Sequence, residues 1–568
     1  MDTGFTRQEM TRWLSPGQLV HTGLRVLLSG IFGTYADKRE FQEGRASAPC
    51  DLSDRSELWF DYVSDLGDGF NPTYALATLL AEEKLDLAGA GGPSLPTQRG
   101  RLLVMGGDQV YPAADIDGYR DRLVGPYRAA LPWTPGPEFP QILALPGNHD
   151  WYDGLTAFTR VFCQGSWIGG WTTGQRRSYF AAALPHRWWL WGIDIQFDTY
   201  IDEPQLEYFR TVVGERVERG DSIILCSAKP NWVNANDDKP DAYDTLDFFH
   251  RTVIEPLGAV VRLNLTGDTH HYARYQETGG DAQLITAGGG GAFLSDTHHL
   301  PDHLRLPPPE SHRSRHRPGL PDEFDLRISY PTKSESRRIA CGAVGLGRKN
   351  PSFVALLAAV YVLYAWTIQS GIRRPGDTFS RVMHGLSATG IATGIARSPL
   401  ALVVTALLVL GLAGFTKATA KPKKYGLGAS HALAHLVTVV AVIRGVGVVL
   451  DGVHGLPYLA GYLVLVGAAG GLLGSLVMAA YLYVADRFFS CNANELFAAQ
   501  RIEDKKNFVR LHIDTSGMLT VYPVKVDRVP TKWRLRPEGR LEDPWFEAVG
   551  APPQPVLIEP PIQIAPAG

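Results

Sequence analysis

Cysteine is scarce in this sequence, and its five residues are widely scattered. None of them shares a CxxC spacing with another, which argues against a zinc finger or a disulfide framework and favours a reducing compartment. A strong charge is also missing, because a formal net charge of -3 provides no basic field for nucleic acid. The N-terminal stretch has no cationic residues leading into an apolar core, so it predicts no secretory signal.

Polar and apolar residues are distributed unevenly along the chain. Charged residues, Trp and Pro are plentiful up to about residue 350, whereas 351–486 is rich in Leu, Val, Ala and Gly. The mean hydropathy of -0.08 therefore averages a soluble part and a membrane part. At 568 residues the chain is too long for one hydrophobic core. We predict an N-terminal helical extension (1–57), a main soluble domain (58–300), a Pro/Arg-rich linker (301–350), a membrane region (351–486), a cytoplasmic β-hairpin segment (487–535) and a Pro-rich disordered tail (536–568).

Short β-rich runs alternate with helical stretches between residues 58 and 295, which predicts an α/β domain. Most of the runs end in Asp, Gly, Asn or His, and ligands bind beyond the carboxyl ends of strands in such sheets. The segment PTYALATLLAEEKLDLA (72–88) is typical of a helix. The predicted strands are LWFDYVSD, RLLVMGGD, QILALPGNHD, WWLWGIDIQ, SIILCSAKP, VRLNLTGD and QLITAGGG.

Four apolar runs in the second half are each near the length that crosses a bilayer. They span 351–372, 398–415, 429–450 and 456–485, and predict an integral, multi-pass membrane protein. The Lys and Arg residues that flank them place both termini and the soluble domain in the cytoplasm, although four Arg residues in the first loop oppose this orientation. Gly467, Gly471 and Gly474 allow close helix approach and predict self-association of the chain.

Chemistry-bearing residues gather in four motifs at predicted strand ends. Any one of them alone would more often cap a turn or a helix. Together they supply the oxygen and nitrogen ligands that a paired metal site needs. The motifs are SDLGDGF with Asp65 and Asp68, GGDQVYP with Asp108 and Tyr111, PGNHDWY with Asn148, His149 and Asp150, and TGDTHHY with Asp268, His270 and His271.

This pattern resembles the calcineurin-like metallophosphoesterase superfamily, and its GDxxY form is similar to that of purple acid phosphatases. The family pattern runs DxG, GDxxY, GNH(D/E), a lone His after a strand, and then GHxH. The resemblance covers about 58–295 and implies that 58–300 is a metallophosphoesterase domain. It further implies a sandwich of two mixed β-sheets flanked by helices, here followed by an all-α transmembrane bundle.

The resemblance also implies a role for each matching residue. Asp65, Tyr111 and His270 would bind the first metal ion. Asp108 would bridge both ions, and Asn148 would bind the second. His149, oriented by Asp150, would contact the transferring phosphoryl group or protonate the leaving alkoxide.

Two departures from the family pattern concern the second ion. Ala228 stands where the lone His would be, and Asp268 replaces the first His of GHxH. We therefore expect an asymmetric pair: Fe(III) or Mn(II) held by Asp65, Asp108, Tyr111 and His270, and a hard divalent ion (Ca, Mg or Mn) held by Asp108, Asn148 and Asp268. A single-metal site is the alternative.

The expected function is hydrolysis of a phosphomonoester or phosphodiester by a metal-activated hydroxide in a membrane-anchored enzyme. A catalytically weak metal-binding or regulatory module on the same fold is the alternative. A transporter with an accessory soluble domain is less well supported, since the membrane half shows no repeated pair of broken helices. The expected partners are a lipid bilayer and a phosphate ester, with a lipid-linked substrate suggested by proximity alone, and no nucleic acid.

The remaining polar residues favour structural interpretations. Asp68 suits a turn, and His271 should point away from its neighbour His270 on an extended segment. The glycine run before His298 and His299 lacks the Lys of a phosphate-binding loop, so it predicts a close backbone turn near the site.

Overall fold

The computed structural model describes residues 3–20, 48–89, 94–134, 139–195, 200–237, 239–316, 319–537 and 540–567. Much of the predicted N-terminal extension, at 21–47, lies outside this part of the chain. Two compact units are present, and each is described by itself. The sheet unit comprises Met1–Thr11, Thr22–Ser336 and Ile502–Gly568, and the helical unit comprises Arg12–His21 and Arg337–Arg501.

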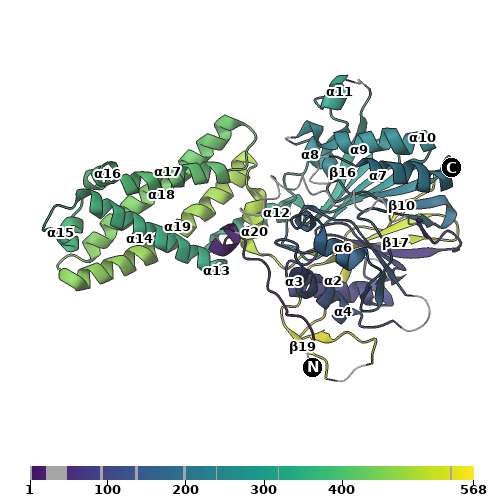
Figure 1. Ribbon diagram of the computed structural model, residues 1–568, viewed down its shortest axis with the longest axis horizontal. Helices are drawn as coiled ribbons and strands as arrows, with labels where there is room; N and C mark the ends of the chain where they lie inside the picture. The colour runs from purple at the N-terminus through teal and green to yellow at the C-terminus, as the bar shows by residue number, and fades with distance from the viewer. Residues whose placement is uncertain are drawn as a thin grey trace. The chain divides into compact units, whose positions relative to one another are not determined.

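The sheet unit contains two nine-stranded sheets of mixed strand direction (Figure 1). The first runs in the order β1 (Cys50–Asp51), β9 (Phe180–Leu184), β10 (Trp188–Gly192), β11 (Ser222–Cys226), β12 (Val260–Thr266), β14 (Gln283–Ala287), β13 (Tyr272–Glu277), β16 (Asp322–Tyr330) and β15 (His303–Leu306). Within it β10, β11, β12 and β14 are parallel.

The second sheet joins the two ends of the sequence. Its order is β21 (Pro555–Leu557), β18 (Leu519–Val526), β17 (Lys506–Ile513), β2 (Leu58–Val63), β5 (Leu102–Met105), β6 (Gln141–Ala144), β8 (Trp171–Thr173) and β7 (Trp167–Ile168), with β22 (Ile562–Ile564) also pairing with β18. The strands β2, β5 and β6 are parallel, and β17 runs antiparallel to β2. All seven strands predicted from apolar runs are present as β2, β5, β6, β10, β11, β12 and β14.

The two sheets share one hydrophobic core, in which alternate residues of both pack together. Tyr62 of β2, Leu190 of β10 and Leu511 of β17 are fully buried members of this core. Because successive strand residues face opposite sides, the other residues of each sheet face helices. Two groups of helices cover these outer faces (Figure 1). They are α2 (Phe70–Ala81), α4 (Gly125–Ala130) and α6 (Thr156–Phe162) on the second sheet, and α7 (Glu203–Glu207), α9 (Asp244–Phe249) and α10 (Glu255–Leu257) on the first.

Shorter elements complete the sheet unit. They are the strand pairs β3 (Lys84–Leu87) with β4 (Leu95–Gln98) and β19 (Trp533–Leu535) with β20 (Phe546–Ala548), and the helices α3 (Ile116–Tyr119), α5 (Asn148–Trp151), α8 (Asn231–Ala235) and α11 (His312–His316). Helix α12 (Lys333–Ala340) spans the boundary between the units.

Much of the predicted linker (301–336) and of the predicted hairpin segment (502–535) belongs to this sheet unit. Within 301–350, β15 and β16 extend the first sheet, because β16 pairs with β13 over six residue pairs from Tyr272↔Tyr330 to Glu277↔Phe324. The predicted hairpin at 507–529 is confirmed as β17 and β18, yet it is not a separate segment. It pairs with β2, so the predicted boundaries at 300 and 487 are corrected.

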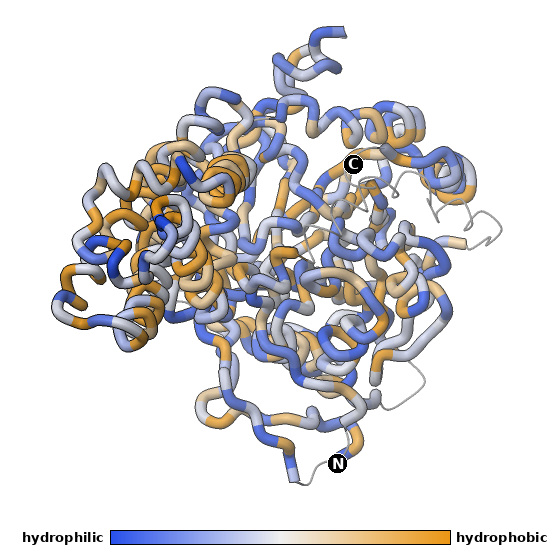
Figure 2. The backbone as a smooth tube through the Cα atoms, turned by 60° about the vertical axis from the view of Figure 1, so that its left-hand side comes forward, coloured by the Kyte–Doolittle hydropathy of each residue, from blue (hydrophilic) through white to orange (hydrophobic). Residues whose placement is uncertain are grey.

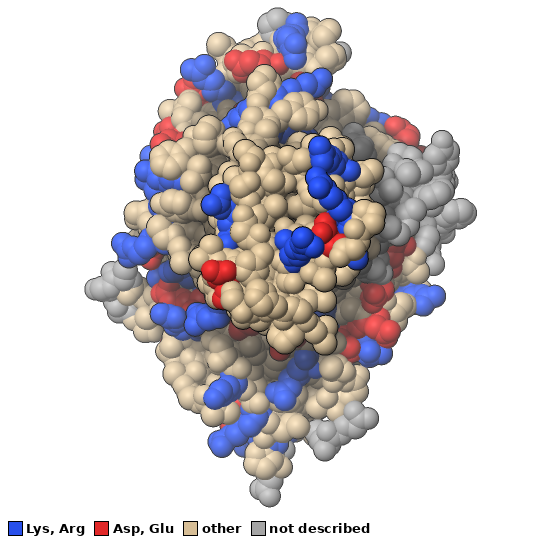
Figure 3. All heavy atoms as spheres, turned by 90° about the vertical axis from the view of Figure 1, so that its left-hand side faces the viewer, with Lys and Arg blue, Asp and Glu red and all other residues tan. Residues whose placement is uncertain are grey.

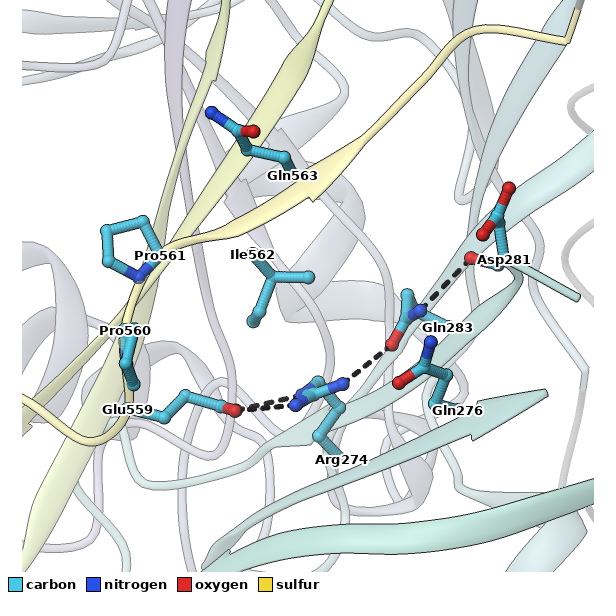
Figure 4. Close-up of a pocket in the computed structure, with 9 residues that line it drawn as sticks. All are labelled: Arg274, Gln276, Asp281, Gln283, Glu559, Pro560, Pro561, Ile562 and Gln563. Carbon is cyan, nitrogen blue, oxygen red and sulfur yellow. Dashed lines mark hydrogen bonds and ion pairs between the residues drawn. The ribbon is translucent and has the colours of Figure 1, made fainter. Parts of the chain in front are cut away.

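The Pro-rich tail is ordered, contrary to the prediction. Strands β21 and β22 pair with β18, and Glu559 between them accepts two hydrogen bonds from Arg274 of β13, at 2.9 and 2.6 Å (Figure 4). Arg274 also donates to Gln283 at 3.0 Å, so its guanidinium is satisfied within the pocket of about 320 Å³ drawn there. The tail is ordered because its backbone and side chains form hydrogen bonds with strands that are distant in the sequence. The local composition of the tail does not reveal these partners.

Long apolar helices form the helical unit (Figure 2). Three of them, α14, α18 and α19, are long and apolar enough to cross a membrane, and the pair α16 and α17, bent by 96°, passes the same test when taken together. The helices are α13 (Leu346–Lys349), α14 (Pro351–Ile372), α15 (Phe379–Met383), α16 (Ala388–Arg397), α17 (Pro399–Phe415), α18 (Lys421–Val449), α19 (Gly455–Phe489) and α20 (Ala493–Gln500).

The outer surface of these helices is apolar, as expected for contact with lipid. Exposed large side chains include Leu407 and Leu410 of α17, Val437 of α18 and Leu472 of α19. Uncharged side chains cover much of the face shown in Figure 3, with a few Lys, Arg, Asp and Glu among them. Three or four membrane-spanning helices therefore agree with the sequence prediction of about four.

The glycines of α19 that predicted self-association pack against another helix of the same chain. A Cβ added at Gly471 would lie 2.7 Å from the Val354 carbonyl oxygen of α14, and one at Gly470 would lie 2.5 Å from Cβ of Tyr361. Small residues thus allow α19 to pack closely on α14. The glycines are explained without a second copy of the chain, and self-association stays a prediction.

Candidate metal centre

Loops at the carboxyl ends of parallel strands from both sheets bring the predicted residues together. Asp65 follows β2 and Asp108 follows β5 in the second sheet, whereas Asp268 and His270 follow β12 in the first. The Asp65 amide donates to the Gly107 carbonyl at 3.0 Å, and the Asp268 amide donates to Oδ2 of Asp65 at 2.9 Å. The two sheets therefore contribute to one site, as ligand sites at strand ends do.

The phenol oxygen of Tyr111 lies at the middle of this group. It is 2.8 Å from Oδ1 of Asp65, 3.2 Å from Oδ2 of Asp108 and 3.0 Å from Nε2 of His270. Nε2 of His270 is 3.6 Å from Oδ1 of Asp65. All four side chains are buried. The four residues expected at the first metal position thus converge on one point.

These four side chains carry more lone pairs than protons. Nδ1 of His270 lies 2.7 Å from the Phe293 carbonyl oxygen, to which it donates, so Nε2 of a neutral ring is an acceptor. Ionised carboxylates have no proton, and a neutral phenol has one. Three acceptors therefore compete for the Tyr111 proton. Such a donor set suits a cation, with carboxylate and phenolate oxygens favouring Fe(III) or Mn(II) over softer ions.

The pKa shifts of Asp65, Tyr111 and His270 also favour a bound cation at this place. Burial raises the pKa of Asp65 well above its ordinary value, and the Asp108 and Asp268 carboxylates raise it further. Burial, Asp108 and Asp65 likewise raise the pKa of Tyr111. Burial, assisted by the charge of Lys506, lowers the pKa of His270 to about 3. A bound cation favours the anionic carboxylates and phenolate, so metal uptake should release protons.

The aspartates also share an uncommon backbone conformation. Asp65, Asp108 and Asp268 adopt φ of 60°, 49° and 65°, in the left-handed region, which is strained for residues other than glycine and is tolerated best by Asn and Asp among them. Such strain costs about 1–3 kcal/mol for a non-glycine residue and clusters at functional sites. Three strained aspartates at strand ends support this as the functional end of the sheets.

Glycines allow the loops to approach the carboxylates closely. A Cβ at Gly147 would lie 2.1 Å from Oδ1 of Asp108, and a Cβ at Gly267 would lie 2.4 Å from Oδ2 of Asp65. The backbone at both positions is compatible with alanine, because neither φ is positive. The glycines are therefore required for space next to the carboxylates.

Replacing Gly147 by alanine should displace Asp108 and weaken metal binding at least about tenfold, by analogy with disturbed ligand support elsewhere. Overpacking should also cost about 1–3 kcal/mol of stability. Calorimetric titration of metal-stripped protein with Mn²⁺ measures the first effect. Gly174→Ala is the matched control, since a Cβ there meets nothing within 4 Å. Equal Mn²⁺ affinity in the two variants would contradict the role assigned to Gly147.

Tyr152 connects to the residues expected at the second metal position. Nδ2 of Asn148 lies 3.3 Å from the Tyr152 hydroxyl. The pKa of Tyr152 is raised first by burial and then by the Asp108 and Asp268 carboxylates, while Asn148 and Lys229 lower it. The charges of both aspartates thus act on the residue that Asn148 contacts, and the second metal position stays a prediction.

Ala228 lies where the missing histidine would stand. Its Cβ would be 3.2 Å from a Cβ built on Gly107, the residue before Asp108, and its carbonyl accepts from the Gly267 amide at 3.1 Å. The position therefore borders both the Asp108 and Asp268 loops. A methyl group at this place offers no ligand atom, and the expected second set of Asp108, Asn148 and Asp268 stays a prediction.

The Asp150 carboxylate is held by hydrogen bonds within its own loop. Its carboxylate accepts from the Gly147 amide at 2.8 Å and from the Tyr119 hydroxyl at 2.5 Å. Nδ1 of His149 instead lies 2.7 Å from the Pro112 carbonyl oxygen. Asp150 is the third residue of α5, and an acidic side chain at this position typically accepts a hydrogen bond from the amide of the N-cap residue, here Gly147. Asp150 therefore shapes the loop, and its expected effect on His149 stays a prediction.

His149 itself lies beside the first group. Its amide donates to Oδ1 of Asp108 at 2.8 Å, and its ring centroid is 4.4 Å from that of Tyr111. The imidazole is half-buried, so it combines contact with the site and access to solvent. This position suits the expected role at a leaving group.

Several supporting residues escaped sequence reasoning. Ser295 accepts from the His270 amide at 3.2 Å, and the Ala292 amide donates to the Asp65 carbonyl at 2.9 Å. Both lie on the segment after β14, so the glycine run is the close turn near the site that the sequence predicted. Tyr119 and Tyr152 were missed as well. The only sequence signal for Tyr152 was its place in the PGNHDWY motif.

Asp68 and His271 have the structural roles that were expected of them. Oδ1 of Asp68 accepts from the Thr11 amide at 2.9 Å, which ties down the N-terminal segment. The His271 ring is buried, and its backbone partner is Asp296 rather than an atom of the metal group.

Comparisons with known proteins do not assign this chain to a family. No protein-family model matches the sequence, and no curated protein matches it. Among solved structures, the chain is similar to one described as "GAP50 the anchor in the inner membrane complex of Plasmodium", at 14% sequence identity and a TM-score of 0.29. The match covers 42% of this chain and 74% of that chain. A similarity of this size supports no argument about fold or function.

Proposed function

We propose that the sheet unit is a metallophosphoesterase-like sandwich that hydrolyses a phosphate ester with the help of bound metal ions. The convergence of Asp65, Asp108 and His270 on the Tyr111 hydroxyl, within 3.2 Å, is the observation that carries this proposal. Hydrolysis of phosphate esters is the reaction that such oxygen-rich paired sites serve.

The metal ions, when bound, would supply acidity to a water molecule and neutralise charge on the phosphoryl oxygens. Asp65, Asp108, Tyr111 and His270 would hold an Fe(III) or Mn(II) ion. Asp108, Asn148 and Asp268 would hold a hard divalent ion, Ca, Mg or Mn. The absence of an imidazole at Ala228 supports this asymmetry.

The protein's own residues would position the ester and manage its protons. The Pro112 carbonyl accepts from Nδ1 of His149 and fixes the ring. In the protonated ring, Nε2 would carry the proton that passes to the leaving oxygen. The Phe293 carbonyl and Ser295 hold His270 in one orientation. Because the strained aspartates are fixed by backbone hydrogen bonds, little rearrangement is needed when substrate binds.

A metal-binding or regulatory module without turnover is the second candidate. Ala228 favours it, since the second metal position lacks a nitrogen ligand that the resembling family supplies. Both candidates predict bound metal, and they differ in turnover. The assay is hydrolysis of p-nitrophenyl phosphate, bis-p-nitrophenyl phosphate and a phosphatidic acid dispersion by the full chain in detergent. Bound metal with no release of product from any of them would favour the module.

Replacing Tyr111 by phenylalanine should remove one ligand atom and weaken binding of Fe(III) or Mn(II) at least about tenfold. Hydrolysis at limiting metal should fall in parallel. Metal content after dialysis, measured by mass spectrometry, reports the change. Tyr200→Phe is the control, because that side chain is 45% exposed. Retention of wild-type metal content in Tyr111→Phe would remove the phenol from the ligand set.

A further inference from the structure

We propose that Asp296, His298 and His299 form a separate binding site for a divalent transition metal ion of the zinc class. One potential ligand atom from each of the three residues lies within 4.8 Å of the other two. His298 is buried, and the other two side chains are half-buried. None of the three belongs to the group around Tyr111. The site would stabilise the loop that follows β14.

The spacing is close to what one ion requires. Zinc binds imidazole nitrogen and carboxylate oxygen at about 2.0–2.2 Å, so two ligands of a tetrahedral ion are about 3.3–3.6 Å apart. The separation of 4.8 Å or less leaves at most a small side-chain movement. Two imidazoles and one carboxylate leave a fourth position for water, and they suit borderline ions such as Zn(II).

Hydrogen bonds already hold the central part of this loop. Oγ of Ser336 accepts from the Thr297 amide at 3.0 Å, and Oγ1 of Thr297 donates to the Pro331 carbonyl at 2.8 Å. Nδ1 of His298 lies 2.8 Å from the same Ser336 oxygen. Metal-binding histidines usually donate their second ring N–H to such a partner. With Nδ1–H directed at Ser336, Nε2 carries the lone pair that an ion needs.

A fourth imidazole borders the loop and gives independent support. The His271 side chain is 3% exposed, and its Nδ1 has no hydrogen-bond partner in the part of the chain that the structure describes. Its hydrogen-bond contact is with the Asp296 backbone. A buried ring nitrogen without a partner is costly unless a bound ion or water compensates it. Nδ1 of His271 is therefore one further nitrogen atom near the three residues that could bind an ion.

The consequence of metal binding here is structural. Ser295 directly precedes Asp296, and Ser295 and Phe293 both hold His270 through hydrogen bonds of 3.2 and 2.7 Å. An ion at Asp296, His298 and His299 would fix the end of the segment that positions His270. The inference stands without the proposed hydrolysis, because it needs neither substrate nor the group around Tyr111.

The test counts zinc ions bound by the full chain in detergent after chelator treatment. Wild type, Asp108→Asn, His299→Ala and the double variant are dialysed against micromolar Zn²⁺ alone and analysed by mass spectrometry. His299→Ala should bind about one zinc ion fewer per chain, in the wild-type and in the Asp108→Asn background alike. His250→Ala is the control, since that ring is exposed and lies outside both sites. His298→Gln and Asp296→Asn should lower zinc affinity at least about tenfold, and a folded chain is verified by its melting transition.

The two metal sites can be judged separately in the same experiment. Equal zinc content in Asp108→Asn and in the double variant would overturn the Asp296 site. Loss of one zinc ion in His299→Ala, with no loss of any metal in Asp108→Asn, would support the Asp296 site and contradict the proposed function.

Discussion

Replacing Asp108 by asparagine should lower hydrolysis of an aryl phosphate by about a thousandfold or more. The substitution keeps the shape of the side chain and removes the charge that both expected metal positions share. Two-metal stabilisation contributes several kcal/mol to such a reaction, and each 1.36 kcal/mol is about a factor of ten in rate. Initial rates with p-nitrophenyl phosphate at saturating Mn²⁺ measure the loss, and metal analysis should show less metal per chain.

The control for this experiment is Asp117→Asn. Its side chain is 78% exposed and pairs only with Arg120 on the surface, so rate and metal content should stay near those of the unaltered protein. If Asp108→Asn hydrolyses the aryl phosphate at the rate of the control, the proposed function is wrong. A loss of rate without loss of metal would instead limit Asp108 to a role in binding substrate.

Replacing Arg510 by leucine should destabilise the sheet unit by about 3–5 kcal/mol. Arg510 of β17 is completely buried, and its Nε and a second guanidinium nitrogen donate to the Asp61 carboxylate of β2 at 2.7 and 3.2 Å. A third nitrogen donates to Oγ1 of Thr97 at 3.1 Å. Removing the cation leaves the Asp61 charge buried with only the Gly100 amide, at 3.0 Å, as its remaining donor among these contacts. The midpoint of urea unfolding, followed by tryptophan fluorescence in detergent, measures the effect.

A double variant separates the cost of a lone charge from the value of the pair. Asp61→Leu with Arg510→Leu should be more stable than Arg510→Leu alone, because a buried apolar pair is often as stable as an ion pair. Arg528→Leu is the surface control, with a side chain 90% exposed, and should cost less than about 0.5 kcal/mol. An Arg510→Leu midpoint equal to that of Arg528→Leu would show that the pair contributes nothing.

The sequence predicted the central strands well because they are buried on both faces. The runs IILC of β11 and LLVM of β5 are apolar throughout. Polar residues such as Asp65 after β2 and Asp108 after β5 mark the strand ends. The carboxyl ends of parallel strands meet at one edge, so the convergence of these side chains could be anticipated. The long apolar helices were equally visible, and α14 begins and ends where the sequence placed it.

The edges of the fold were not predictable in the same way. Strands β21 and β22 have three residues each and lie among prolines, so they show no periodicity of their own. Helix α2 ends at Ala81, and Lys84–Leu87 forms β3 instead of continuing the predicted helix, because β4 supplies its hydrogen-bond partners. The Asp150 carboxylate accepts from the Gly147 amide only three residues away, a local contact that the sequence analysis did not anticipate. The misses at the strands instead reflect non-local partners that override the local pattern.

The pairing of β2 with β17 restricts the number of times that the chain can pass through a membrane. Leu58 pairs with Ile513 and Tyr62 pairs with Val509, yet all the long apolar helices found in the described residues lie between these strands in the sequence. Two hydrogen-bonded strands cannot be separated by a bilayer, so the segment between β2 and β17 must return to the side from which it left, and its passes must total an even number. If α14, α18 and α19 each pass once, the bent pair α16 and α17 has to complete the fourth passage.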